Sequence, residues 1–175
     1  YDAIASGKLR YVRIDEKSSF NEAYGRRLKK DLQTIKISPK VGDRVMVNFS
    51  MDKVIIEEVT PRINDLVRPD VANVDQVLLV FSAIRPDFSF HLLDKFLVIF
   101  NKQNLHITLV VSKIDLIEDN DLQKLKENLN YYKENLGIEI HYVNSKQKIG
   151  FDTLEDIFKD NSTVLAGQTG VGKQT

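Results

Sequence analysis

The sequence has 175 residues, of which 42% are hydrophobic and 29% are charged, and its 25 Lys and Arg are balanced by 25 Asp and Glu. The absence of cysteine excludes disulfide bonds and thiolate metal sites and favours a reducing compartment, and the three histidines lack the spacing of metal ligands. No apolar run approaches the roughly 18 residues of a membrane span, and the charged N-terminus does not match a signal peptide. We therefore expect a cytoplasmic protein that does not bind membranes, and we take it to be monomeric.

The first 60 or so residues show short alternating strands separated by turns, a pattern typical of a small all-β unit. Strands are predicted over residues 8–15, 43–49 and 53–59, with a turn signature, SPKVGD, before the second of them. Several short strands in so small a unit favour a compact barrel of the OB type, assigned to residues 1–64. Two prolines and alternating charges predict a linker over residues 61–70.

The charge is unevenly spread along the chain. Residues 1–64 carry 13 basic and 9 acidic side chains, whereas residues 65–175 carry 12 and 16. The basic excess is concentrated in Arg26, Arg27, Lys29, Lys30, Lys36 and Lys40. This stretch is either a solvated surface loop or a contact for the phosphate backbone of a nucleic acid, and composition alone favours the surface loop.

From residue 75 onward, predicted strands and helices alternate. The strands, each short and apolar, are residues 76–82, 106–112, 138–143 and 162–166. The helices, with apolar residues at helical spacing, are residues 89–103, 119–135 and 152–158. Ser89 is a suitable N-cap for the first helix. This order predicts a doubly wound, mainly parallel α/β domain over residues 65–175, in which ligands bind beyond the carboxyl ends of the strands.

The last predicted strand leads into a glycine-rich segment, GQTGVGKQT, typical of a loop that binds phosphate. Gly167 and the pair Gly172 and Lys173 match the spacing G-x-x-x-x-G-K. Glycines let successive backbone amides point at one anion, and the lysine adds a positive charge for the β and γ phosphates. Gln174 stands where a Mg²⁺-binding Ser or Thr is expected, and Thr175 comes one residue late. The predicted phosphate-binding residues are Gly167, Gln168, Thr169, Gly170, Val171, Gly172 and Lys173.

The strand at 106–112 ends in the sequence SKID, which suits recognition of guanine. Asp115 could accept hydrogen bonds from N1 and the exocyclic N2 of guanine, whereas adenine would leave this carboxylate desolvated and unpaired. Lys113 could lay its alkyl stem along the base. In residues 144–146 a backbone N–H could reach guanine O6, although a plain polar loop is the simpler interpretation of these three alone. The predicted guanine-binding residues are Ser112, Lys113, Asp115, Ser145 and Lys146.

Together these segments resemble a circularly permuted P-loop GTPase, because the base-reading segments precede the phosphate loop. Domain termini usually lie close together at the surface, so such a permutation is tolerable. The motifs that carry a closer resemblance are SPKVGDRVMV (38–47), RINDLVRP (62–69), ANVD (72–75), LLDKFL (92–97), SKIDL (112–116) and GQTGVGK (167–173). In this order they resemble the bacterial ribosome-assembly GTPases that mature the small ribosomal subunit.

This resemblance implies GTP hydrolysis in late maturation of the small (30S) subunit, with GTP or GDP and Mg²⁺ as ligands and a barrel that contacts rRNA. It makes the basic stretch an RNA-binding candidate. It also implies a further helix, two switches and a C-terminal zinc module after the phosphate loop. We therefore expect this sequence to be truncated or incompletely ordered at its C-terminal end, with no metal site and with its catalytic residues unknown.

Two departures and two alternatives accompany the resemblance. Ser112 replaces Asn or Thr, which is expected to weaken the bond between the base-reading loop and the phosphate loop, and Gln174 replaces the magnesium ligand. One alternative is a P-loop ATPase or small-molecule kinase with an accessory barrel. The other is a non-catalytic RNA-binding protein whose nucleotide site has degenerated.

Overall fold

The computed structural model describes residues 3–10, 12–13, 34–35, 38–50 and 53–171. The chain forms two compact units, Tyr1–Asn73 and Val74–Thr175. The division falls after residue 73, later than the boundary predicted at residue 64. Within the described ranges, no helix is both long and apolar enough to cross a membrane.

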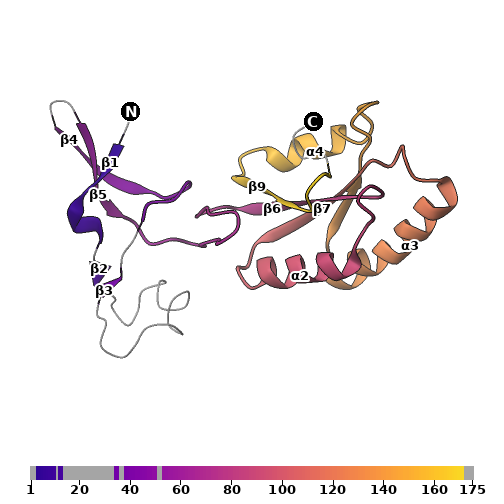
Figure 1. Cartoon of the computed structure of the whole chain (residues 1–175), viewed down its shortest axis with the longest axis horizontal. Coiled ribbons are helices and arrows are strands. Elements are labelled where there is room, and N and C mark those ends of the chain that lie inside the picture. Colours follow the sequence, from indigo (N-terminus) through magenta and orange to yellow (C-terminus); the bar gives the residue numbers. More distant parts are fainter. Residues whose placement is uncertain (1–2, 11, 14–33, 36–37, 51–52, 172–175) are drawn as a thin grey trace. The chain divides into compact units, whose positions relative to one another are not determined.

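The first unit contains two small β-sheets (Figure 1). Its elements are β1 (Ala3–Ala5), the 3₁₀ helix η1 (Gly7–Arg10), β2 (Val12–Arg13), β3 (Thr34–Ile35), β4 (Val45–Ser50) and β5 (Lys53–Val59). β5 pairs parallel with β1 and antiparallel with β4, and β2 pairs antiparallel with β3. Residues 8–10, predicted as strand, belong to η1 because Leu9 is buried there against Val59. The described strands form open sheets and no closed barrel, so the OB-type barrel stays a prediction.

Residues 61–73, which include the predicted linker, fold against the turn before β4. Arg62 is only 6% exposed, and its guanidinium donates two hydrogen bonds to the carboxylate of Asp43, at 2.7 and 2.8 Å. Ala72 N donates to Val41 O at 2.9 Å. The prolines and charges that suggested a linker therefore belong to a folded segment held by a buried ion pair.

Lys40, one of the predicted RNA-binding residues, lies in the same ionic cluster. Its Nζ is 2.6 Å from an oxygen of Asp65 and 2.6 Å from an oxygen of Asp70, and it donates to Leu66 O at 3.1 Å. Burial alone would lower the pKa of Lys40, but the hydrogen bonds and charges of the two carboxylates outweigh it and raise that pKa. All three N–H donors are thus directed at partners within the unit, which leaves Lys40 no donor for an RNA phosphate.

The second unit has the alternating order of strands and helices predicted from the sequence. Its elements are β6 (Gln76–Ser82), α2 (Phe90–Asn101), β7 (His106–Ser112), α3 (Asp119–Leu136), β8 (Glu139–Tyr142), α4 (Asp152–Phe158) and β9 (Thr163–Gly167). The four strands form one parallel sheet in the order β8-β7-β6-β9. Figure 1 shows α2 and α3 on one face of this sheet and α4 on the other. The predicted N-cap is confirmed, since Ser89 Oγ accepts a hydrogen bond from Leu92 N.

β6 is one of the two inner strands of this sheet, and all seven of its residues are buried. Leu78 and Val80 pack on the face covered by α4, in one cluster with Leu154 of that helix. Phe81 points to the opposite face, where its ring centroid lies 6.1 Å from that of Phe96 in α2. Because each such side chain contributes about 1.5–3 kcal/mol when fully buried, this two-sided core fixes the position of the strand ends that carry the site.

Candidate nucleotide-binding site

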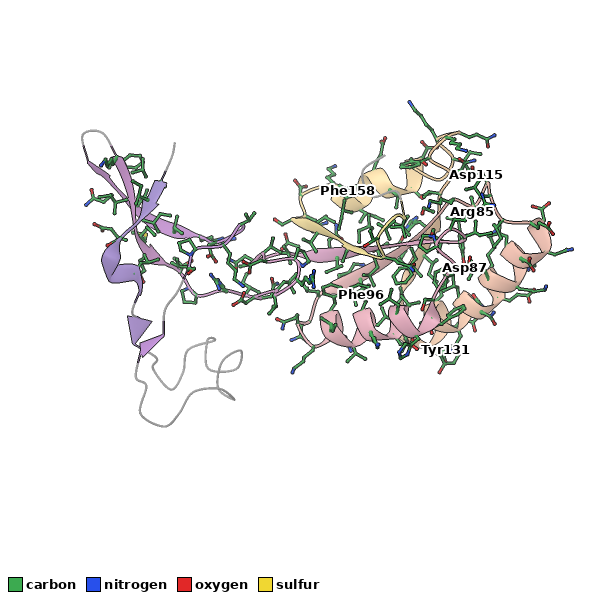
Figure 2. All side chains as sticks on the ribbon, viewed as in Figure 1. Arg85, Asp87, Phe96, Asp115, Tyr131 and Phe158 are labelled. Carbon is green, nitrogen blue, oxygen red and sulfur yellow. The ribbon has the colours of Figure 1, made fainter. Side chains whose placement is uncertain are left out.

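Three segments meet at the carboxyl edge of the parallel sheet. They follow β6, β7 and β9, whose parallel pairing places their carboxyl ends side by side. Figure 2 shows Asp115, after β7, and Arg85, after β6, at this same edge. The edge is where ligands bind in open α/β sheets.

The phosphate loop begins at Gly167, the last residue of β9. Gly167 pairs with Val80 of β6, has a φ of +134°, and a Cβ at this position would lie 2.0 Å from Val80 O. Only glycine can follow this path. At the far end of the described loop, Val171 is fully buried in the cluster of the α4 face. Gly172, Lys173, Gln174 and Thr175 lie outside the described residues.

Ser112 joins the end of β7 to the phosphate loop. Its Oγ donates a hydrogen bond of 2.6 Å to Val171 O, and the residue is 7% exposed. A buried carbonyl that lacked a donor would cost about 1–3 kcal/mol. Replacing Asn or Thr by Ser112 is expected to weaken the bond between the base-reading loop and the phosphate loop. The bond is nevertheless present, because the end of β7 lies close enough for a serine hydroxyl to reach Val171 O.

Lys113 holds all three segments together. Its Nζ donates to Gly170 O of the phosphate loop at 2.6 Å and also donates to Arg85 O of the loop after β6. Its backbone has a φ of +58°, an uncommon conformation for a residue with a side chain. Lys113 also lines the cavity at this edge, and its contact with a base stays a prediction.

One cavity of about 410 Å³ brings the predicted guanine-binding residues together. All five of them, Ser112, Lys113, Asp115, Ser145 and Lys146, line it, and Val171 of the phosphate loop lines it as well. Its apolar lining comes from the sheet residues Leu78, Val80, Val110 and Leu165 and from Leu154 and Phe158 of α4, so the cavity also extends between the sheet and that helix. Its volume and its apolar lining with few polar groups are typical of small-molecule sites.

Asp115 offers the carboxylate that a guanine edge requires. Its side chain is 21% exposed, and its Oδ2 lies 3.9 Å from Lys146 Nζ, which is at the outer limit of an ion pair. Its oxygens are therefore not committed to a close partner by this pair. Two adjacent N–H donors of a base could therefore bind the two oxygens without displacing a close contact to Lys146.

Asn144 shapes the loop after β8, a role that the sequence analysis did not assign. It is 3% exposed, and its Oδ1 accepts from Lys146 N at 3.0 Å and Gln147 N at 3.2 Å. This role could have been predicted from the sequence, because an asparagine side chain in a turn often accepts a hydrogen bond from the backbone N–H two residues later. Within the described part of the chain, Ser145 N–H donates no hydrogen bond of this kind, so it stays a candidate donor for a ligand.

The metal prediction concerns residues that the structure does not describe. Among the described residues, no group of three or more His, Asp or Glu is arranged to hold a metal ion. The position after Lys173, which supplies a hydroxyl to Mg²⁺ in loops of this type, is Gln174 and lies outside the described ranges.

Comparison with known proteins identifies the family. A sequence model described as RsgA GTPase matches residues 59–175, more than half of the chain. The chain belongs to the RsgA GTPase family. A curated RsgA-family relative, the small ribosomal subunit biogenesis GTPase RsgA of Onion yellows phytoplasma (strain OY-M), is 54% identical over 136 residues, which cover 78% of this chain and 44% of the relative. The chain thus spans less than half of the length of this RsgA protein.

Two solved structures support the same assignment. YjeQ from Thermotoga maritima is 36% identical with a TM-score of 0.70, and the match covers 78% of this chain and 49% of YjeQ. YloQ, described as a circularly permuted GTPase, is 34% identical with a TM-score of 0.64, and the match covers 93% of this chain and 56% of YloQ. The α/β unit of this RsgA-family chain therefore has the parallel-sheet fold of the permuted GTPases, as predicted from the order of its motifs.

Proposed function

We propose that this chain is the guanine-nucleotide-binding part of a GTPase that acts in late maturation of the small (30S) ribosomal subunit. The observation that carries the proposal is the single cavity at which Ser112, Lys113, Asp115, Ser145 and Lys146 meet, bonded to the phosphate loop. The family assignment supports the reaction, and the name of the phytoplasma relative supports the process.

In the proposed complex, each part of the nucleotide has its own partners. Asp115 accepts from N1 and N2 of guanine, Ser145 N–H donates to O6, and the stem of Lys113 covers the base. The backbone amides from Gly167 onward, with Lys173, hold the phosphates of GTP or GDP, bound with Mg²⁺. Hydrolysis then depends on positioning and electrostatic stabilisation rather than on covalent chemistry by the protein.

Nucleotide preference separates this proposal from an ATPase or kinase. We expect the wild-type protein to bind GTP and GDP at least tenfold more tightly than ATP in equilibrium titrations. The change Asp115→Asn should lower GTP affinity and raise affinity for xanthosine triphosphate, because an asparagine amide can donate to the O2 that xanthine has in place of the N2 donor. Asp87→Asn, at an exposed carboxylate of the same edge, is the matched control. Equal affinity of the wild type for GTP and ATP would contradict the guanine assignment.

Turnover separates a GTPase from a non-catalytic RNA-binding protein. We expect GTP hydrolysis by the full-length protein to rise at least tenfold when small ribosomal subunits are added. Large subunits at equal concentration provide the control. Nucleotide binding without turnover, with and without small subunits, would favour the binding-protein alternative.

The proposed rRNA contact belongs to an OB-type barrel in the first unit. Its candidates are Arg26, Arg27, Lys29, Lys30 and Lys36, which lie outside the described residues, whereas Lys40 is left out because its donors are engaged internally. Glutamate at the first four positions should weaken subunit binding and reduce its salt slope by roughly 0.7–0.9 per lost phosphate contact. The control is the same reversal at four exposed lysines of the second unit, Lys102, Lys124, Lys133 and Lys159. An unchanged salt dependence of subunit binding would show that these basic residues do not contact rRNA phosphates.

A cytoplasmic location, a monomeric state and a zinc-binding module outside residues 1–175 are parts of the same proposal. They follow from the proposed role in ribosome assembly and from the greater length of the relatives. Size-exclusion chromatography with light scattering and metal analysis of the full-length protein would test the last two.

A further inference from the structure

Arg85 is the only arginine among residues 74–175, and it lies at the same edge of the sheet as the candidate nucleotide site (Figure 2). It occupies the loop between β6 and α2, at the carboxyl edge of the sheet. Its backbone touches the centre of the site, because Arg85 O and Gly170 O accept from the same ammonium group of Lys113. Two acceptors of one ammonium group can lie no more than about 6 Å apart.

The loop that carries Arg85 is held by an internal hydrogen bond and by a hydrogen bond to the end of β7, and it lies next to the phosphate loop. Ser82 Oγ donates to Pro86 O at 2.6 Å, and Ala83 N donates to Ser112 O at 2.9 Å. The ring of Pro86 is adjacent to Gly170, since its Cδ would lie 3.9 Å from a Cβ at that glycine. These contacts fix the backbone from which the Arg85 side chain extends.

Arg85 itself has two unusual features. Its φ is +52°, a left-handed conformation that costs free energy for a residue with a side chain and is enriched at functional sites. Its side chain is exposed, and within the described part of the chain its guanidinium has no hydrogen bond or ion pair. By contrast, Lys113 is bonded to two carbonyls and Lys146 lies beside Asp115.

We propose that Arg85 is a further phosphate-binding residue of this site, whose guanidinium contacts the phosphate groups of the bound nucleotide. A guanidinium presents parallel N–H donors that match two phosphate oxygens, and it remains charged at any working pH. Its carbonyl shares the ammonium group of Lys113 with the carbonyl of Gly170, so the side chain starts near the loop proposed to bind those phosphates. The inference rests on the proposed function only in requiring that a nucleotide binds here, and it does not depend on the identity of the base.

The test compares ligands that differ only in their phosphates. Affinities for GTP, GDP and guanosine are measured by calorimetry for the full-length wild type, Arg85→Gln, Arg85→Lys and the control Lys102→Gln, which removes an exposed positive charge at the end of α2. We expect Arg85→Gln to weaken GTP and GDP about tenfold and to leave guanosine unchanged. Arg85→Lys should retain part of the affinity, and Lys102→Gln should match the wild type.

Several outcomes would overturn the proposal. One is that Arg85→Gln binds GTP and GDP as tightly as the wild type. A second is that Arg85→Gln loses as much affinity for guanosine as for GTP, which would indicate an effect of the backbone at residue 85. A third is that Lys102→Gln loses as much affinity for GTP and GDP as Arg85→Gln does. If the wild type prefers ATP, the guanine assignment fails, but the same comparison with ATP, ADP and adenosine still decides the role of Arg85. If the wild type binds neither nucleotides nor tripolyphosphate, both proposals are wrong.

Discussion

At the scale of single residues, Ser112 connects the two halves of the nucleotide site. Its hydroxyl is the donor to Val171 O, a carbonyl at the end of the described phosphate loop, and both residues are buried. We expect Ser112→Ala to destabilise the second unit by about 1–3 kcal/mol, because that carbonyl is left without a donor. Affinity for GDP should fall about tenfold as the loop loses its anchor.

Chemical denaturation and titration with GDP would measure both effects. Ser112→Thr is the control, since it keeps the hydroxyl and should retain most of the affinity. A fully stable Ser112→Ala protein with wild-type affinity would show that the phosphate loop does not depend on this bond.

The residues of the site were only partly predictable from the sequence. The placement of Asp115 and Lys113 at the cavity could be predicted, because a short motif after a buried strand restricts where its side chains lie. Lys40 could not be excluded as an RNA contact, because its partners Asp65 and Asp70 are 25 and more positions away and meet it only in the fold. Arg85 was not predicted, because only the fold brings its carbonyl and that of Gly170 to the same ammonium group of Lys113.

At the scale of elements, the pairing of β6 with β9 depends on Gly167. A methyl group there would lie 2.0 Å from Val80 O, and the φ of +134° is unfavourable for any side chain. We expect Gly167→Ala to destabilise the second unit by about 3 kcal/mol or more, because strain and a backbone clash add. Thermal unfolding followed by circular dichroism would measure the loss.

Gly137→Ala is the matched control for this change. Gly137 ends α3 with a φ of +66°, but no atom lies within 4 Å of a Cβ at this position. Its replacement should therefore cost only the backbone term of about 1–2 kcal/mol. Equal losses in the two variants would show that the clash with Val80 O relaxes and that β9 has more freedom than its pairing suggests.

The elements of the second unit were more predictable than those of the first. β6 and β7 are largely apolar, and their bounds match the predicted residues 76–82 and 106–112, because a strand that is mostly buried has a strong composition signal. For residues 61–73 the composition was misleading. Their prolines and charges resemble a linker, and only the long-range pair of Arg62 and Asp43 makes them part of a folded unit.

At the scale of the whole molecule, each unit has its own stabilising core. In the first unit this includes the pair of Asp43 and Arg62, whose side chains are 2% and 4% exposed. Burial alone would raise the pKa of Asp43, but the hydrogen bonds and charges of Arg62 and Lys40 outweigh it and lower that pKa. The ionised carboxylate therefore stabilises the folded unit at neutral pH.

The sign of this shift predicts the acid response of the first unit. Its stability should be constant above about pH 5 and fall as Asp43 is protonated below about pH 4, because the unfolded chain binds that proton first. Asp43→Asn should cost about 1–3 kcal/mol at pH 7, because Arg62 loses one carboxylate partner and keeps the other, Asp65, and should flatten the acid response. Denaturant unfolding from pH 3 to 8 measures both, with Asp121→Asn, at an exposed pair on α3, as the control. If the Asp43→Asn protein still lost stability steeply at low pH, the acid response would belong to other carboxylates.

Separate cores also predict separate unfolding transitions. The cluster of Leu9 and Val59 lies in the first unit, whereas that of Leu78, Val80 and Val110 lies in the second, beneath the nucleotide site. GDP at about 100 times its Kd should stabilise the second unit by about 2.7 kcal/mol, raising its melting temperature on the order of 10 °C and leaving that of the first unchanged. Calorimetry of the Asp43→Asn protein separates the transitions, because its first unit melts earlier. A shift of both transitions by GDP would mean that nucleotide binding is transmitted to the first unit, and the two would then have to be treated as one cooperative system.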